Sequence, residues 1–303
     1  MVAMGEKELL SPEYVTMILT GIASGMIARF ITLYVDFRQT PTFPNGVFNN
    51  IVIGFVASCL GAVAIPALME KEFTAITFLA LATQHFRDIR KTEAESLQKL
   101  DDIGFTKRGD AYIDGIAKTY EARNYISIIS ALTASLLVYA LGEQTIVIRI
   151  ALALLAGLII TWLIRFKTKG KNIGDICAVK EGRIRMDGSE LFVDDLYVTS
   201  FLGAQSGKEM FLEEGMAVVI TPNDQEYQVT IDNEGQRQAM LFEAGRTLGI
   251  KQFSFTRRSF SKGVVIIAIV PIIKDIGKMI DAIKHTPVLE NSRKAKSIMR
   301  AGN

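Results

Sequence analysis

The chain has 303 residues, of which 49% are hydrophobic, and its mean hydropathy is positive at +0.27. This apolar content is high for a soluble protein with 22% charged residues, so the composition favours a membrane protein with a soluble part. The formal net charge of only +2 provides no general basic field, which argues against a nucleic-acid partner.

Four apolar segments are long enough to cross about 30 Å of hydrocarbon as helices. They are Tyr14 to Val35, Val47 to Met69, Asn124 to Leu141 and Thr145 to Phe166. A short polar loop joins the members of each pair, so the sequence predicts two helical hairpins. Acidic residues precede the first segment and further segments follow it, which favours a retained helix over a cleaved signal peptide.

Small residues recur four positions apart inside these segments, a spacing that lets helix backbones approach closely in lipid. We interpret these stripes as the packing surfaces of one four-helix bundle. Homo-oligomerisation through the same stripes is the alternative. The stripes include Gly21 and Gly25, Gly54 and Ser58, Ala57 and Gly61, Ser127, Ala131 and Ser135, and Ala153 and Gly157.

The positions of Lys and Arg indicate the orientation of the bundle. The segment Glu70 to Arg123 carries nine of them and four more follow the last span, whereas the loop after the first span has only Arg38. The sequence therefore predicts a multi-pass protein of the cell membrane, surrounded by membrane lipid, with both termini in the cytoplasm.

The run Phe73 to Phe86 is apolar but only about half as long as a span requires. It continues into FRDIRKTEAESLQKL, which is rich in helix-forming residues. We interpret it as an amphipathic helix that extends the second span or lies on the inner leaflet. A fifth, short span is the alternative, and it would move the C-terminal domain to the other side of the membrane unless one further segment also crossed.

After Gly170 the sequence changes to short apolar runs separated by glycine and acidic pairs, which is typical of strands. The runs ICAV, RIRM, ELFV and LYVTS indicate a meander, and GMAVVITPNDQEYQVTI indicates a hairpin that turns at Pro222 to Asp224. Two more strands are expected at Gln252 to Thr256 and at Gly263 to Val270. The second is apolar on both faces and is therefore expected in the centre of its sheet.

Helical signals accompany these strands. A helix is expected from Glu234 to Leu248, with Asn233 as its N-cap and Gly249 as its C-cap. Apolar residues at helical spacing from Ile272 to Ile283 form a stripe that covers the sheet, with a helix in the plane of the membrane as the alternative. The basic tail behind them is expected to be disordered, or to touch anionic lipid.

The predicted fold class is thus an α-helical membrane bundle of two hairpins and four spans, followed by a soluble α+β domain with a mixed sheet and one packed helix. The predicted division is 1–69 for the first hairpin, 70–124 for a cytoplasmic helical segment, 125–167 for the second hairpin, 168–285 for the α+β domain and 286–303 for the basic tail.

Few residues have the character of a reactive site. Arg29 and Arg149 fall in the spans near one end, where they can pair with Asp36 and Glu143; this pairing is favoured over an anion-binding role. The core of the bundle carries no other ionisable group, which disfavours small-solute transport.

Neither a metal nor a cofactor is predicted. His85 and His285 have no second histidine or cysteine at ligand spacing, and Cys59 and Cys177 are expected to be packing residues. The tripeptide Asp187 to Ser189 is similar to one half of an aspartic-protease site. Because that chemistry needs two facing carboxylates, a β-turn is expected there instead.

Residues Tyr112 to Ala117 read YIDGIA within the stretch AYIDGIAKTYEARNY. This stretch closely resembles the signature of the bacterial YIEGIA protein family, with Asp114 in place of the glutamate in the family's name. The upstream FLALATQHFRDIR and the downstream NEGQRQAM are similar to further blocks of that family, so the resemblance extends from the first span to about Pro271. It implies a membrane protein made during sporulation in an endospore-forming Firmicute, and it supplies no catalytic residue.

The signature has the properties of a pivot, because Gly115 lowers the local helix propensity and charged residues lead from it into the third span. Charged residues after Phe86 approach the same membrane face from the other side. We therefore predict a polar cluster at the inner mouth of the bundle, with a structural salt-bridge network as the alternative. Its candidate functional residues are Arg87, Asp88, Arg90, Asp110, Tyr112, Asp114, Gly115 and Arg123.

The leading functional hypothesis is a non-enzymatic membrane scaffold or regulator of sporulation, which presents its α+β domain to an unidentified protein partner. The alternative is a membrane-anchored protease, or a regulator of proteolysis, during sporulation. That alternative needs paired catalytic groups, and the sequence does not locate them.

Overall fold

The computed structural model describes residues 11–33, 45–71 and 73–292, which form two compact units. The first, here called the bundle unit, contains Met1–Glu93 and Ile116–Lys169. The second, here called the α+β unit, contains Ala94–Gly115 and Gly170–Asn303. The chain therefore passes between the units three times, and the predicted five-part division stays a prediction.

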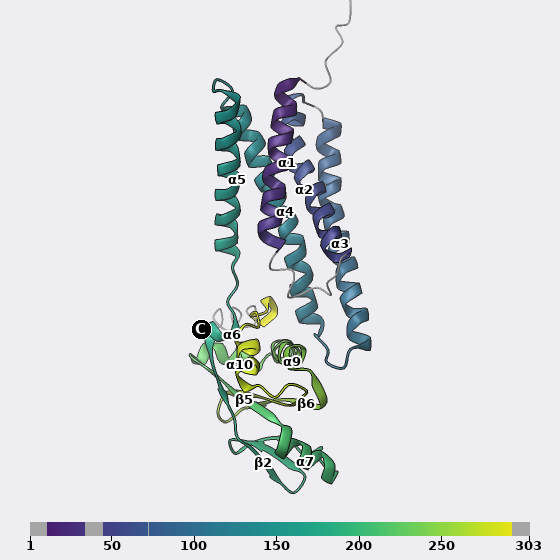
Figure 1. The fold of residues 1–303 in the computed structure, drawn as a ribbon, viewed down its shortest axis with the longest axis vertical. Helices are drawn as coiled ribbons and strands as arrows, with labels where there is room; N and C mark the ends of the chain where they lie inside the picture. Colours follow the sequence, from purple (N-terminus) through teal and green to yellow (C-terminus); the bar gives the residue numbers. More distant parts are fainter. Residues whose placement is uncertain (1–10, 34–44, 72, 293–303) are drawn as a thin grey trace, which may run out of the picture. The chain divides into compact units, whose positions relative to one another are not determined.

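Five long helices supply the bundle unit (Figure 1). They are α1 (Pro12–Leu33), α2 (Asn45–Met69), α3 (Phe73–Ile103), α4 (Asp110–Ala140) and α5 (Ile146–Thr168). Among the described residues, α1, α2 and α5 are long and apolar enough to cross a membrane. The segment expected to form the third of four spans is the C-terminal half of α4, which is not one of these three helices.

Small residues bring the helices of the bundle unit into backbone contact. A Cβ atom added at Gly61 of α2 would overlap the carbonyl oxygen of Ile128 of α4, and one added at Gly25 of α1 would lie 2.7 Å from Ser58 Cβ. Ser135 of α4 donates to the carbonyl oxygens of both Met17 (3.0 Å) and Ala62 (3.1 Å). The predicted packing role of the small residues is confirmed, and homo-oligomerisation stays a prediction.

The two ends of the bundle unit are defined by polar contacts. At one end the Tyr14 hydroxyl donates to Glu70 at 2.6 Å, which places the end of α2 beside the start of α1. At the same end Arg149 pairs with Glu13 at 2.9 Å rather than with the expected Glu143, because Glu13 lies at the neighbouring start of α1. Arg149 also donates to Val138 O of α4.

At the other end, Arg29 near the end of α1 donates to Asn50 near the start of α2. Its expected partner Asp36 lies outside the described residues. Tyr120 of α4 is close enough to interact with Arg29, so α4 enters the bundle unit at this end.

These contacts set the direction of α3. It begins beside the end of α2, and farther along, Arg90 pairs with Glu121 of α4 at 3.0 Å. The stretch Phe73 to Arg90 therefore runs antiparallel to α4 along the bundle, over about 25 Å at 1.5 Å per residue (Figure 1). The two ends of the segment 70–124, which was predicted to be cytoplasmic, thus lie at opposite ends of the bundle unit. The two-hairpin prediction puts them at the same end.

Two antiparallel sheets form the centre of the α+β unit. The larger has the order β1 (Cys177–Glu181), β5 (Met216–Pro222), β7 (Val264–Pro271) and β6 (Ile250–Ser259). The smaller is a meander of β2 (Ile184–Asp187), β3 (Glu190–Val193) and β4 (Leu196–Thr199).

The prediction of a mixed sheet is wrong for the described strands, because β7 lies between the two strands that run in the same direction, β5 and β6. Every pair in the larger sheet is consequently antiparallel. The expected central position of β7 is confirmed, since all eight of its residues are buried.

Helices cover both faces of the larger sheet. Alternate β7 residues such as Ile267 face a core shared with α9 (Glu234–Leu248), α10 (Ile276–Lys284) and the short α6 (Ile173–Ile176). The others, such as Ile266, face a second core with β3, β4 and Phe211 of α7 (Gln205–Glu214). The single packed helix of the prediction is therefore too few. The predicted covering role of the stripe is confirmed for Ile276 to Ile283, whereas Ile272 and Ile273 precede α10 and are exposed.

The caps predicted for α9 are present. Asn233 Oδ1 accepts from Gln236 N at 3.2 Å, and Gly249 donates to Gly245 O with a φ of +69°. The hairpin predicted after β5 is wrong, because its second half forms η2 (Gln225–Tyr227) and α8 (Gln228–Asp232). The Asp224 side chain accepts from Glu226 N and so starts a helical turn where a second strand was expected.

Replacing Gly61 by alanine tests the close approach of α2 and α4. The added methyl group would overlap a main-chain carbonyl that cannot rotate away, so we expect a loss of about 1–3 kcal/mol in unfolding free energy. Thermal denaturation of the purified protein in detergent measures it. The matched control is Gly170→Ala, where an added Cβ meets nothing within 4 Å, and an equal loss in both variants would contradict the packing role.

Candidate functional site

A tight turn places the signature segment at the start of α4. Asp101 of α3 accepts from Arg108 Nη1 at 2.9 Å and from Gly109 N at 3.0 Å. Gly109 has a φ of +82°, a conformation that side chains other than glycine rarely adopt, and Asp110 then begins α4. Gln98 Nε2 donates to Asp110 Oδ1 at 3.2 Å, so the carboxylate of Asp110 serves as a local contact between the two helices.

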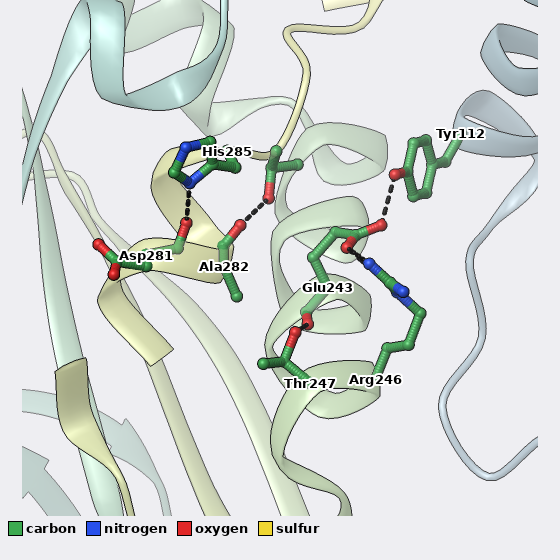
Figure 2. A network of polar contacts seen from close by, with 8 residues as sticks. Tyr112, Glu243, Arg246, Thr247, Asp281, Ala282 and His285 are labelled. Atoms are coloured by element: carbon green, nitrogen blue, oxygen red, sulfur yellow. Dashed lines mark hydrogen bonds and ion pairs between the residues drawn. The ribbon is translucent and has the colours of Figure 1, made fainter. Parts of the chain in front are cut away.

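Tyr112 is a residue of the YIDGIA signature that is buried in the α+β unit. Its side chain is 2% exposed, and its hydroxyl donates to Glu243 Oε1 of α9 at 2.5 Å. The other carboxylate oxygen of Glu243 accepts from Arg246 Nη2 at 2.6 Å and from Nε at 3.2 Å. Figure 2 shows the carboxylate of Glu243 reached by both side chains. Each charged group of this trio therefore has a partner, and Arg246, whose side chain is 42% exposed, reaches the buried carboxylate from the surface.

Phe242 completes the contact beside this trio. The Tyr112 ring meets it edge to face, with centroids 6.1 Å apart, and the Arg108 guanidinium carbon lies 4.6 Å from its centroid. Such aromatic and cation–π contacts each contribute roughly 0.5–1.5 kcal/mol. Arg108 and Tyr112 both contact Phe242, so these contacts hold the α3–α4 turn against α9.

The first turns of α9 bind the same segment through the main chain. Gln238 Nε2 donates to Lys107 O at 2.5 Å. A Cβ atom added at Gly235 would lie 2.7 Å from Ala111 Cβ, so only glycine permits this approach. The YIDGIA stretch and the NEGQRQAM stretch, far apart in sequence, are thus neighbours in the α+β unit.

Gln236 of α9 fastens the C-terminal segment to the same place. It is fully buried, donates to Pro287 O at 3.0 Å and accepts from Leu289 N at 2.8 Å and from Ser292 Oγ at 3.3 Å. A Cβ atom at Gly115 would contact Leu289 at 3.8 Å. Residues 287–292 are therefore packed, and the rest of the predicted tail lies outside the described residues.

Electrostatics keep the Tyr112 hydroxyl in its donating form. Burial first, and then the negative charge of Glu243, raises the pKa of Tyr112 well above its ordinary value, and the positive charges of Arg246 and Arg108 only partly oppose this. A protonated tyrosine and a carboxylate with filled hydrogen-bonding positions make a clamp rather than an acid–base pair. We call the contact of Arg108, Tyr112, Phe242, Glu243 and Arg246 the signature clamp.

The predicted site residues fall in both units. Arg90 pairs with Glu121, and Tyr125 of the same helix donates to Glu121 at 3.0 Å and interacts with Arg87; Asp88 and Arg123 belong to the same unit. The remaining four, Asp110, Tyr112, Asp114 and Gly115, belong to the α+β unit. Each unit thus gathers part of the set, and a single cluster of all eight stays a prediction.

Sequence reasoning missed the partners of the signature. Glu243 and Arg246 are spaced as a solvent-exposed pair on a helix, so nothing in their pattern indicates burial. Both residues lie outside the YIDGIA and NEGQRQAM stretches, so the family resemblance did not indicate them either.

Other candidates have local roles. Asp187 and Glu190 face each other across the β2–β3 turn, where Gly188 has a φ of +58°, so the predicted β-turn is confirmed. His285 Nδ1 lies 2.7 Å from Asp281 O at the end of α10 (Figure 2). Within the described ranges, no three His, Cys, Asp or Glu side chains are grouped so as to hold a metal ion.

The fold and the clamp define a class: a membrane protein with apolar helices and an α+β unit that encloses its own signature segment. A profile of the YIEGIA protein family matches residues 17–299, and the chain belongs to this family. It is 35% identical over 287 residues to the uncharacterized protein YphB of Bacillus subtilis (strain 168), which covers 92% of this chain and 94% of YphB. No solved structure matches the chain.

Replacing Tyr112 by phenylalanine tests the signature clamp. The change leaves the ring in place but removes a donor from the buried Glu243 carboxylate, so we expect a loss of about 1–3 kcal/mol in unfolding free energy. Denaturant or thermal unfolding of the full chain in detergent measures it. The control is Tyr197→Phe, whose ring packs on Phe192; among the described residues its hydroxyl has no hydrogen bond. Equal stability of wild type and Tyr112→Phe would contradict the clamp.

Proposed function

We propose that this chain is a membrane-anchored scaffold or regulator of sporulation, whose α+β unit contacts protein partners. The observation that carries the proposal is the signature clamp: Tyr112 of the YIDGIA signature is buried and bonded to Glu243, which also accepts from Arg246. They maintain a structure. The resemblance to the YIEGIA family supplies the expectation of a role in sporulation.

The connections between the units support a scaffold. The α+β unit receives the end of α3, the start of α4 and the chain that follows α5. A domain on one linker could move freely, whereas three chain connections limit how far the α+β unit can separate from its anchor. Such attachment suits a surface that must be presented near a membrane.

Exposed apolar side chains on the α+β unit provide candidate contacts for a partner. Phe201 is 87% exposed, Phe260 is 73% exposed and Ile272 is 70% exposed. Burying a side chain of this size against a partner would contribute about 1.5–3 kcal/mol. Phe201 precedes α7 and Phe260 follows β6, so neither is needed for the hydrogen bonding of the sheets.

The proposed localisation is the cell membrane, with five crossings. The stretch Phe73 to Arg90 runs the length of the bundle unit, and about 25 Å approaches the thickness of the hydrocarbon layer. Among the described residues, the end where α1 begins carries the basic side chains of Lys71 and Arg149, whereas the other end carries Arg29, Arg87, Arg90, Arg123 and Arg165. The positive-inside tendency then puts the start of α1 outside and the α+β unit in the cytoplasm.

Cysteine accessibility tests this topology against the four-span alternative with both termini inside. In a Cys59→Ser, Cys177→Ser background, single cysteines are introduced at Ser11, Glu143 and Glu190 and labelled in intact cells with a membrane-impermeant maleimide. Five crossings predict labelling at positions 11 and 143 and protection at 190. Glu143 lies outside in both arrangements and is the positive control. Protection at position 11 would return the chain to two hairpins.

The functional proposal is tested in sporulating Bacillus subtilis that lacks YphB and expresses this chain or not. A scaffold predicts a protein that crosslinks to the full chain while its abundance stays the same in both strains. Phe201→Ser should reduce that crosslink severalfold, whereas Tyr197→Phe should not. A protein that accumulates at least severalfold in the strain without this chain would contradict the scaffold and favour regulated proteolysis.

A further inference from the structure

A buried arginine lies near the end of α1 in the bundle unit. Arg29 is 1% exposed, although it belongs to an apolar helix. Its Nε donates to Asn50 O and its Nη2 to Asn50 Oδ1, both at 2.9 Å. Gly54 of α2 makes room for it, since a Cβ atom there would overlap the aliphatic part of the arginine. The fold thus accommodates a charge, and both of its hydrogen-bonding partners are neutral.

No carboxylate neutralises Arg29 within the described residues. Glu121 is paired with Arg90, and Glu93 acts on Tyr120 but forms no ion pair with Arg29. A second positive charge lies close by, because Arg123 of α4 is 4% exposed and near enough to Arg29 for the two to repel each other. A buried cation without a counter-charge is strongly unfavourable.

Buried hydrogen-bonding atoms without a partner occur on Arg29 and on one face of α4. In the part of the chain that the structure describes, Arg29 Nη1, Tyr120 Oη and Ser127 Oγ have no hydrogen-bond partner, and each belongs to a residue less than 10% exposed. The Arg123 guanidinium carbon lies 5.6 Å from the centre of the Tyr120 ring. Tyr120, Arg123 and Ser127 recur at helical spacing and share one face of α4.

We propose that Arg29, Tyr120 and Ser127, with Arg123 beside them, bind a phosphate-type anion. Each of the first three residues has a donor to offer, and the guanidinium fork matches phosphate geometry. Water could satisfy the hydroxyl groups but would leave the charge of Arg29 uncompensated. The anion is a lipid headgroup phosphate or a free phosphate. This site does not depend on the scaffold function.

The test uses the full chain in detergent and measures its melting temperature. The probes are phosphatidylglycerol, a galactolipid with the same acyl chains but no phosphate, and sodium phosphate against sodium chloride at equal ionic strength. We expect a rise of about 3 °C with phosphatidylglycerol or phosphate and none with the galactolipid. A response to inorganic phosphate identifies a free anion, and a response to the phospholipid alone identifies a headgroup.

Variants locate the response. Arg29→Gln should abolish the rise, whereas Arg149→Gln should retain it, because Arg149 lies at the opposite end of the bundle unit and is paired with Glu13. Because Arg29→Gln also removes hydrogen bonds to Asn50 that join α1 to α2, Tyr120→Phe and Ser127→Ala provide an independent test. Each removes an unpartnered hydroxyl group, so the melting temperature without probe should stay equal or increase, and the rise with probe should fall by at least half.

Three results would overturn the proposal. One is the absence of any rise with both phosphate-bearing probes, and another is an undiminished rise in Tyr120→Phe and Ser127→Ala. The third is a rise in melting temperature with the phosphate probes that appears in an Asp36→Asn variant but not in the wild type. That result would mean that Asp36 supplies the counter-charge of Arg29.

Discussion

A hydrogen bond between residues 131 positions apart determines how the α+β unit is assembled. A tyrosine hydroxyl and a carboxylate that are both buried cannot separate without losing their partners, and leaving such groups unsatisfied costs about 1–3 kcal/mol each. Tyr112 and Glu243 therefore tie the α3–α4 turn to α9. Because α9 covers one face of the larger sheet, the turn helps to hold this helix against its core.

The same requirement appears in the bundle unit, where hydrogen bonds join neighbouring helices. Ser135 bonds to the main chain of both α1 and α2, and Ser24 lies 2.9 Å from Ser130. Such contacts need close backbones, which the glycines permit. Small residues and hydroxyl groups are thus two aspects of one packing solution, and helix propensity contributes little to it.

Sequence patterns predicted the elements whose signals are local. The caps of α9, the central position of β7 and the β-turn at Gly188 follow from residues next to one another in the chain. The hairpin after β5 was wrong because the alternation in QEYQVTI competes with an N-cap at Asp224, and the cap prevails. The burial of Glu243 was out of reach, because it depends on a tyrosine from another part of the chain.

The direction of α3 shows why the bundle was harder to predict than its parts. Two hairpins with a connector at one end, and five helices with α3 running back, share the same apolar segments and the same loops. The difference lies in which ends meet, and the pairs that decide it, Tyr14 with Glu70 and Arg90 with Glu121, each join helices through one polar contact. No periodicity records such contacts.

Charge distribution connects this arrangement to the buried arginine. With α3 running back along the bundle, Arg29 and Arg123 lie at the same end as Arg87 and Arg90, and Arg165 of α5 joins them there. An anionic membrane surface attracts such an end, at about 1 kcal/mol for each basic residue near it. Arg87 and Arg165 are exposed and can be served by lipid and water together. Arg29 is enclosed by helices, so a ligand for it must enter the protein, and that difference separates a binding site from a basic surface.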